Sequence, residues 1–148
     1  MLEKLKKNKD IINIKEVDNL IELECDKNNI LSVLKKLKEN DDFIFDQLLD
    51  ITAVDKPSRE YRFDLVYIIQ SLKKNKKLIL KTSLKENDTI ETIISVHKAA
   101  DWYERECYDL FGIEFKNHPD LRRIMTDYNF EGHPLRKDFP LTGHTEVR

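Results

Sequence analysis

The sequence has 148 residues, of which 40% are hydrophobic and 36% are charged. This length suits one domain with a single core, and the apolar share is too high for a disordered chain. The net charge of −2 gives no general basis for binding nucleic acid. No apolar run approaches the roughly 20 residues that a membrane-spanning helix needs.

The two cysteines, Cys25 and Cys107, exclude a disulfide scaffold and favour a reducing compartment. An iron–sulfur cluster usually takes about four thiolates, which two distant cysteines do not supply. We therefore expect both to be small buried side chains, and we expect no cluster in this chain.

Alternating apolar residues around a turn at residues 17–19 predict an antiparallel hairpin over residues 12–25. Asp26 is suited to cap a following helix, because its carboxylate can accept first-turn N–H groups. The spacing of Ile, Leu and Val over residues 27–40 predicts an amphipathic helix that lies on the sheet. Residues 43–55 are apolar and β-branched enough for a further strand.

A second hairpin is predicted over residues 61–84, with the lysine-rich KKNKK as its solvated turn. Asp88 and Asp101 are each followed by Glu three residues later, which is the capping-box spacing and predicts two short helices. Gly112 stands where a left-handed helix C-cap is expected. Together these elements predict an α+β fold, a two-layer domain in which helices cover a mixed or antiparallel sheet.

The apolar periodicity ends near residue 115, and residues 116–148 hold three of four prolines and three of four histidines. We expect an α+β domain over residues 1–115 and an extended partner-binding tail over 116–148. The kind of cation also changes: 17 Lys and two Arg precede residue 105, whereas two Lys and five Arg stand from residue 105 onward. Arg makes bidentate carboxylate pairs, so this region predicts an ion-pair network.

A helical wheel over residues 99–111 places Glu106 inside an apolar stripe, where a carboxylate needs a cationic partner. The alternative is that Glu106 reaches water at the edge of the stripe. Arg105 and Asp109, one turn apart, are expected to pair on the opposite face. The candidate cations for Glu106 are Arg122, Arg123 and Arg136.

Two features of the C-terminal third have more than one interpretation. Its aromatic residues fit either a core or an interface, since interface hot spots combine aromatic side chains with Arg. Its His and Asp residues also suggest a metal site, although their spacing matches no known pattern and the His-Pro pairs suit turns. A free-standing metal-dependent hydrolase would use side chains from the set His118, Asp120, His133, Asp138 and His144.

The stretches DWYERECYDLFGIEFKNHPDLRRIM and GHPLRKDFPLTG, within residues 100–146, resemble a signature of respiratory complex I, the proton-pumping NADH:quinone oxidoreductase. The signature is that of the complex I subunit designated C. The resemblance implies a peripheral-arm subunit with an N-terminal α/β domain and a C-terminal segment along the quinone-site subunit, designated D, near the one designated B. FMN and the iron–sulfur clusters would lie in partner subunits, with no cofactor, catalytic residue or nucleic-acid site in this chain. It would lie peripheral to the inner membrane, on the cytoplasmic or mitochondrial matrix side, without spanning it.

By motif position the resemblance implies twelve fold-defining or interface residues: Glu104, Arg105, Glu106, Asp109, His118, Asp120, Arg122, Arg123, Pro134, Arg136, Lys137 and Asp138. The chain would scaffold the quinone-site subunit while electrons pass from NADH through FMN and Fe–S centres to quinone, coupled to proton translocation. The same motif resembles the equivalent subunit of membrane-bound hydrogenases and ferredoxin-linked complexes, which stays an alternative. Many family members continue past PLTG, so the end at Arg148 fits either a compact version or a chain that has lost the end of its tail.

Overall fold

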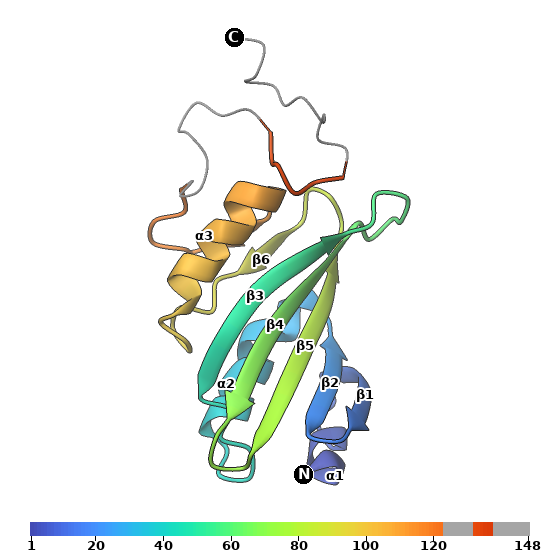
Figure 1. Ribbon diagram of the computed structural model, residues 1–148, viewed down its shortest axis with the longest axis vertical. Helices are drawn as coiled ribbons and strands as arrows, with labels where there is room; N and C mark the ends of the chain where they lie inside the picture. Colours follow the sequence, from blue (N-terminus) through green and yellow to red (C-terminus); the bar gives the residue numbers. More distant parts are fainter. Residues whose placement is uncertain (123–131, 138–148) are drawn as a thin grey trace.

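The computed structural model describes residues 1–122 and 132–137, and its centre is a five-stranded sheet (Figure 1). The strand order is β1-β2-β5-β4-β3. Neighbouring strands run antiparallel except β2 and β5, which are parallel, so the sheet is mixed as predicted. The strands are β1 (Ile11–Val17), β2 (Leu20–Cys25), β3 (Gln47–Asp55), β4 (Phe63–Ser71) and β5 (Lys76–Leu84).

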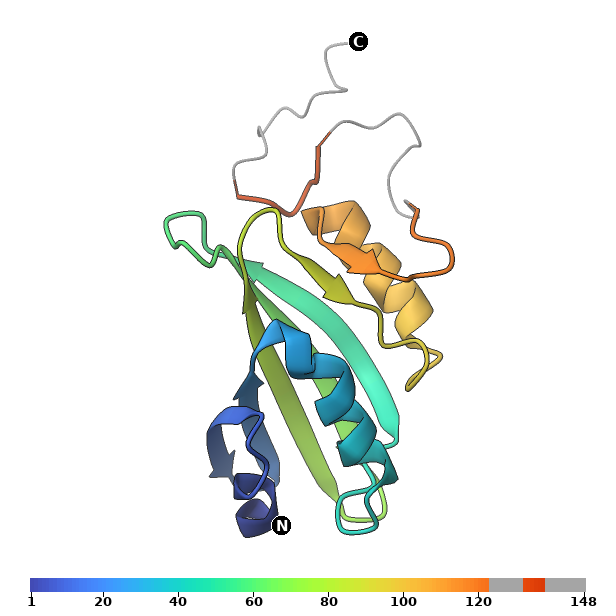
Figure 2. The same ribbon diagram turned by 180° about the vertical axis from the view of Figure 1, so that it is seen from behind.

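Helices cover one side of this sheet and leave the face seen in Figure 1 without a helix (Figures 1 and 2). Helix α2 lies across the covered face, and α3 lies along β3. Two short strands, β6 and β7, pair in parallel between the end of β5 and α3. The remaining elements are α1 (Leu2–Lys6), the 3₁₀ turn η1 (Lys27–Asn29), α2 (Ile30–Glu39), β6 (Thr89–Glu91), α3 (Ala100–Phe111) and β7 (Glu114–Lys116). None of the helices in these described ranges is long and apolar enough to cross a membrane.

The two predicted hairpins and the helix between them are confirmed, as β1–β2, β4–β5 and α2. Asp26 caps as predicted, because its carboxylate accepts the Asn28 N–H at 2.9 Å. The helix predicted from Asp88 is wrong. There the Asp88 carboxylate accepts the Lys85 N–H at 2.8 Å, which closes a turn, and the next three residues pair with β7 as strand β6.

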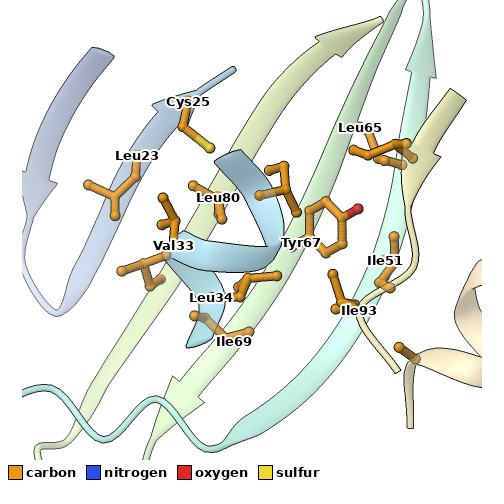
Figure 3. Close-up of a cluster of buried hydrophobic side chains, with 14 of the residues drawn as sticks. Leu23, Cys25, Val33, Leu34, Ile51, Leu65, Tyr67, Ile69, Leu80 and Ile93 are labelled. Carbon is orange, nitrogen blue, oxygen red and sulfur yellow. The ribbon is translucent and has the colours of Figure 1, made fainter. Parts of the chain in front are cut away.

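The main core lies between α2 and the covered face of the sheet (Figure 3). Val33 and Leu34 of α2 are fully buried, as are Tyr67, Ile69 and Leu80 of the central strands. Burying a large apolar side chain contributes about 1.5 to 3 kcal/mol each, so this layer accounts for much of the stability of the fold.

The free edge of β3 is covered by α3. Cys107 of α3 is buried, and its thiol lies 3.3 Å from the carbonyl oxygen of Ile51 in β3. Cys25 is also buried and unbridged, which confirms the expectation for both cysteines. Helix α3 therefore holds a fixed position against the sheet, and the C-terminal segment is built on this helix.

Candidate functional site at the two ends of helix α3

Helix α3 buries a different stripe from the one predicted. Ala100, Glu104, Cys107 and Phe111 face the sheet, whereas Glu106 is partly exposed. A carboxyl side chain does lie on the buried face of this helix, as predicted, but it belongs to Glu104 and not to Glu106. The helix is rotated toward Phe111, because that ring packs edge-on against Phe63 of β4, with 6.4 Å between ring centres.

Glu104 is completely buried and ties α3 to the chain after β6. One carboxylate oxygen accepts the hydroxyl of Thr92, and the other accepts the Ile93 N–H at 2.8 Å. Burial raises the pKa of Glu104 to about 7, although both hydrogen bonds oppose the shift. The buried carboxyl group of α3 is thus Glu104, and its partners are neutral donors of the preceding segment; an arginine partner was predicted for Glu106 instead.

His118 anchors the start of the C-terminal segment against the first turn of α3. Its side chain is fully buried, and Nδ1 accepts the Asp120 N–H at 3.0 Å. In the neutral ring Nε2 therefore carries the proton, and it lies 3.3 Å from the carbonyl oxygen of Asp101. The same nitrogen lies 3.2 Å from Asp101 Oδ1 and 3.9 Å from Glu104 Oε1, so it faces two carboxylates.

The predicted pair between Arg105 and Asp109 is wrong. Arg105 Nε instead lies 3.2 Å from Asp101 Oδ1, one turn earlier on the same helix. Asp109 is fully buried. Beyond the helix, Asp120 and Arg122 form an exposed pair at 3.0 Å, so Arg122 has a partner other than Glu106.

The other end of α3 is capped by residues 132–137, which lie beside that end in Figure 1. His133 Nδ1 lies 2.9 Å from the carbonyl oxygen of Asp109, so Nδ1 carries the proton and donates. The Leu135 N–H donates to the Leu110 carbonyl at 2.9 Å, and Arg136 Nε donates to the Phe111 carbonyl at 2.6 Å. The last carbonyls of a helix have no partner within it, and here the GHPLR stretch supplies three donors in succession.

Gly112 makes this close approach possible. It ends α3 with φ of +78°, as predicted for a left-handed cap, and its N–H returns to the Tyr108 carbonyl at 2.8 Å. A Cβ at this position would lie 2.7 Å from the His133 ring and 2.9 Å from Arg136. Both the backbone conformation and the space therefore require glycine.

A buried ion-pair network joins the cap to the end of the sheet. Arg62 donates two hydrogen bonds to Asp55, at 2.7 and 2.9 Å, and the Lys137 N–H adds a third at 2.7 Å. These donors, Arg62 first, hold the pKa of Asp55 below its usual range despite its burial. Glu86 Oε1 lies between Arg62 and Arg136, at 3.3 and 3.4 Å.

Phe63 completes the network beneath these charges. Both guanidinium groups lie over its ring, with Arg62 at 5.3 Å and Arg136 at 5.2 Å from the ring centre. Cations over an aromatic face are favoured, most of all where water is excluded. An ion-pair network is present, but Arg136 is the one described side chain in it from the region of the switch to Arg. Its other members, Asp55, Arg62 and Glu86, lie outside the C-terminal third.

Arg62 was not among the predicted site residues, although the argument from the use of Arg in place of Lys applies to it as well. Only Arg59 and Arg62 precede residue 105 among 17 lysines. Both pair with buried carboxylates, Arg59 with Asp64 at 2.6 Å and Arg62 with Asp55. The rare use of Arg in a Lys-rich part of the sequence was therefore the signal that could have identified these buried ion pairs.

The remaining predicted residues divide by position. Pro134 lies in the cap, between His133 and Leu135. Arg123 and Asp138 lie outside the described residues, and the division into a domain and a tail near residue 115 stays a prediction. Within residues 1–122 and 132–137, no three His, Cys, Asp or Glu side chains gather closely enough to hold a metal ion.

Comparison with known proteins identifies the family of this chain. Residues 23–145 match the family described as "Respiratory-chain NADH dehydrogenase, 30 Kd subunit". The NADH-quinone oxidoreductase subunit designated C of Cereibacter sphaeroides is 51% identical over 121 residues, which is 82% of this chain and 60% of that protein. The Rickettsia typhi protein of the same name is 52% identical over 119 residues, or 80% of this chain and 60% of that protein. The chain thus spans about three fifths of the length of these curated relatives.

A solved structure shares the fold. The structure is of the membrane-bound sulfane sulfur reductase, an archaeal respiratory membrane complex, and one of its chains superposes with a TM-score of 0.77 at 25% identity. The match covers 94% of this chain and 82% of that chain. The α3 cap, its glycine and its ion-pair network lie largely within the part of the sequence that the family match covers. The chain belongs to the family of the 30 kDa subunit of respiratory-chain NADH dehydrogenase.

Proposed function

We propose that this chain is a non-catalytic peripheral-arm subunit of an NADH:quinone oxidoreductase, and that it scaffolds the quinone-site subunit, designated D, near the one designated B. Electrons would pass from NADH through FMN and iron–sulfur centres to quinone in the partner subunits, with proton translocation coupled to that transfer. The chain would bind no cofactor of its own and would sit on the cytoplasmic or matrix side of the membrane through the complex.

One observation supports a scaffolding role most directly. The polar groups of the family motif are used to fix the chain's own backbone: His133 and Arg136 donate to α3 carbonyls, and Asp55 holds the Lys137 N–H. Groups committed in this way position a segment, whereas a general acid or base needs access to a substrate. His118 and residues 133–137 are thus held at the two ends of one helix, an arrangement that suits presentation of this region to a partner.

The equivalent subunit of a related ferredoxin-linked or hydrogenase-like membrane complex is a second candidate. The observation that favours this candidate is the similarity to a chain from the archaeal sulfane sulfur reductase complex. The nature of the partners separates the two, because a hydrogenase partner carries nickel-ligating cysteines.

The metal-dependent hydrolase has less support. His118 contacts Asp101 at one end of α3, and His133 contacts the Asp109 carbonyl about two turns further along, or roughly 12 Å at 1.5 Å per residue. Two of the proposed ligands thus lie too far apart for one ion. Asp138 and His144 lie outside the described residues.

Removing the gene and restoring it tests the scaffolding role. Membranes from the deletion strain should lose quinone-dependent NADH oxidation but keep NADH oxidation by an artificial acceptor that takes electrons from the flavin module. Expression of this chain should restore the quinone reaction. Unchanged quinone reductase activity in the deletion strain would contradict the proposal.

A further inference from the structure

Helix α3 has an outer face, between its two anchored ends, that residues 1–122 and 132–137 leave partly exposed. Trp102, the only tryptophan of the chain, is 49% exposed there. By helical position it lies on the side opposite Ala100 and Glu104, which face the sheet. The anchor at His118 borders it, because the His118 ring contacts Asp101, the residue before Trp102.

Arg105 lies beside this ring with unused hydrogen-bonding capacity. Its guanidinium carbon is 5.7 Å from the centre of the Trp102 ring, and its side chain is only 14% exposed. Nε is out of reach of water and lies 3.2 Å from Asp101 Oδ1, but without the alignment of a hydrogen bond. Within residues 1–122 and 132–137 the two terminal guanidinium nitrogens make no hydrogen bond, and unlike Nε they stay accessible to solvent.

This arrangement is unfavourable for an isolated surface. Arg105 Nε is buried without an aligned hydrogen-bond acceptor, so it loses hydration that the ion pair with Asp101 replaces only in part. A half-exposed tryptophan also leaves a large apolar area in water. Asp101 does not fully supply the acceptor that the Arg105 guanidinium lacks, because the same oxygen also lies 3.2 Å from His118 Nε2. Tryptophan and arginine together are the side chains that most often dominate protein interfaces.

We propose that Trp102 and Arg105, here called the Trp102 face, dock a neighbouring protein subunit that inserts an acidic side chain, Asp or Glu, against the guanidinium. A carboxylate matches the planar fork of Arg with two parallel hydrogen bonds, and apolar atoms around it would cover the Trp102 ring. This surface deepens the proposed scaffolding function and rests on it. It adds a second contact area, on α3 itself, beside the C-terminal segment.

Photo-crosslinking in the assembled complex locates the occupant. Benzophenone-alanine would replace Trp102 in the full, tagged chain, and the matched control would carry it at Leu72, which is 63% exposed in the β4–β5 turn. Position 102 should crosslink to a peptide of another subunit that contains Asp or Glu, and position 72 should not give that product. Crosslinks from position 102 only to the chain itself, to lipid or to a peptide without Asp or Glu would overturn the proposal.

Retention of the tagged chain in the complex measures the contribution of the charge. Arg105→Gln should weaken retention about tenfold or more, the effect expected for a lost charge-assisted hydrogen bond. Lys73→Gln is the control, because Lys73 is an exposed cation in the β4–β5 turn and is not one of the twelve motif residues. If the unsubstituted chain assembles and both variants are retained equally, the docking role of the Trp102 face is contradicted, but the scaffolding role is not. If the unsubstituted chain recovers no partner subunit, the scaffolding role fails and this surface fails with it.

Discussion

Arg136 Nε donates a 2.6 Å hydrogen bond to the carbonyl oxygen of Phe111, the last residue of helix α3. The same guanidinium reaches Glu86 and lies over the Phe63 ring, so one side chain joins the C-terminal segment to a helix end and to the sheet. Arg136→Ala should lower the free energy of unfolding by about 2 kcal/mol, since it removes a charge-assisted bond to a helix carbonyl. Urea denaturation of the purified chain measures this.

Lys137→Ala is the matched control for Arg136→Ala. Lys137 is exposed, and its contact with Asp55 is made by the backbone N–H, which alanine keeps. A change of less than about 0.5 kcal/mol is expected for such a surface position. Equal effects of the two substitutions would mean that the Arg136 side chain does not hold the cap.

Gly112→Ala should loosen the cap without touching any of its donors. Alanine strains the left-handed backbone at φ of +78°, and its Cβ meets His133 at 2.7 Å. We expect a loss of about 1 to 2 kcal/mol in thermal or urea unfolding. Hydrogen exchange gives a local readout, because the Leu135 amide, bonded to the Leu110 carbonyl, should exchange faster in the variant. An unchanged Leu135 exchange rate would show that the close approach does not depend on glycine.

Glu104 should make the stability depend on pH near neutrality. Its folded pKa of about 7 lies above the unfolded value of 4.5, so the fold favours the protonated carboxyl. The stabilisation is complete below pH 4.5, is lost as pH rises toward 7, and amounts to about 3 kcal/mol for a shift of this size. Denaturant titrations between pH 4 and 8 should show this fall in the free energy of unfolding.

Glu104→Gln keeps a neutral group in the same place, where its amide can donate to Thr92 and accept from Ile93. The variant should lack that fall and should match or exceed the original chain at pH 8. Glu106→Gln, on the partly exposed side of the same helix, should leave the pH dependence in place. The assignment fails if the two substitutions have the same effect on the slope.

Arg62 should contribute far more to stability than Arg59. The Arg62 and Asp55 side chains are 8% and 1% exposed, so Arg62→Ala leaves a buried carboxylate short of its main partner, at a cost of about 3 to 5 kcal/mol. Arg59 is 40% exposed over Asp64, which Lys56 also contacts, so Arg59→Ala should cost about 1 kcal/mol or less. Chemical denaturation of both variants decides the order, and a reversed order would contradict the buried-network account.

Local patterns predicted the elements whose contacts are local. The two hairpins, helix α2, the Asp26 cap of the 3₁₀ turn before it and the Gly112 cap follow from alternation, helical spacing and turn chemistry. The misread helix at residues 88–91 had the spacing of a capping box, but pairing with β7, 25 residues later in the chain, decided its structure. Local propensity is a weak guide where a tertiary contact competes with it.

The candidate site was only partly visible in the sequence for the same reason. The switch from Lys to Arg identified the region, and Arg136 takes part in the network as a candidate. The wheel missed Glu104, because the rotation of α3 is set by Phe63 and Thr92, which are distant in sequence. Asp55, Arg62 and Glu86 join through the strand order of the sheet, which no motif in the C-terminal third encodes.

The protein composition of the particle purified through a tag on this chain, after mild detergent extraction, tests the central claim most directly. The account predicts the flavin and iron–sulfur subunits of an NADH:quinone oxidoreductase in fixed proportion, with no turnover and no stoichiometric metal in the chain once it is separated from them. A lone chain that carries a stoichiometric transition metal and hydrolyses a substrate would contradict it.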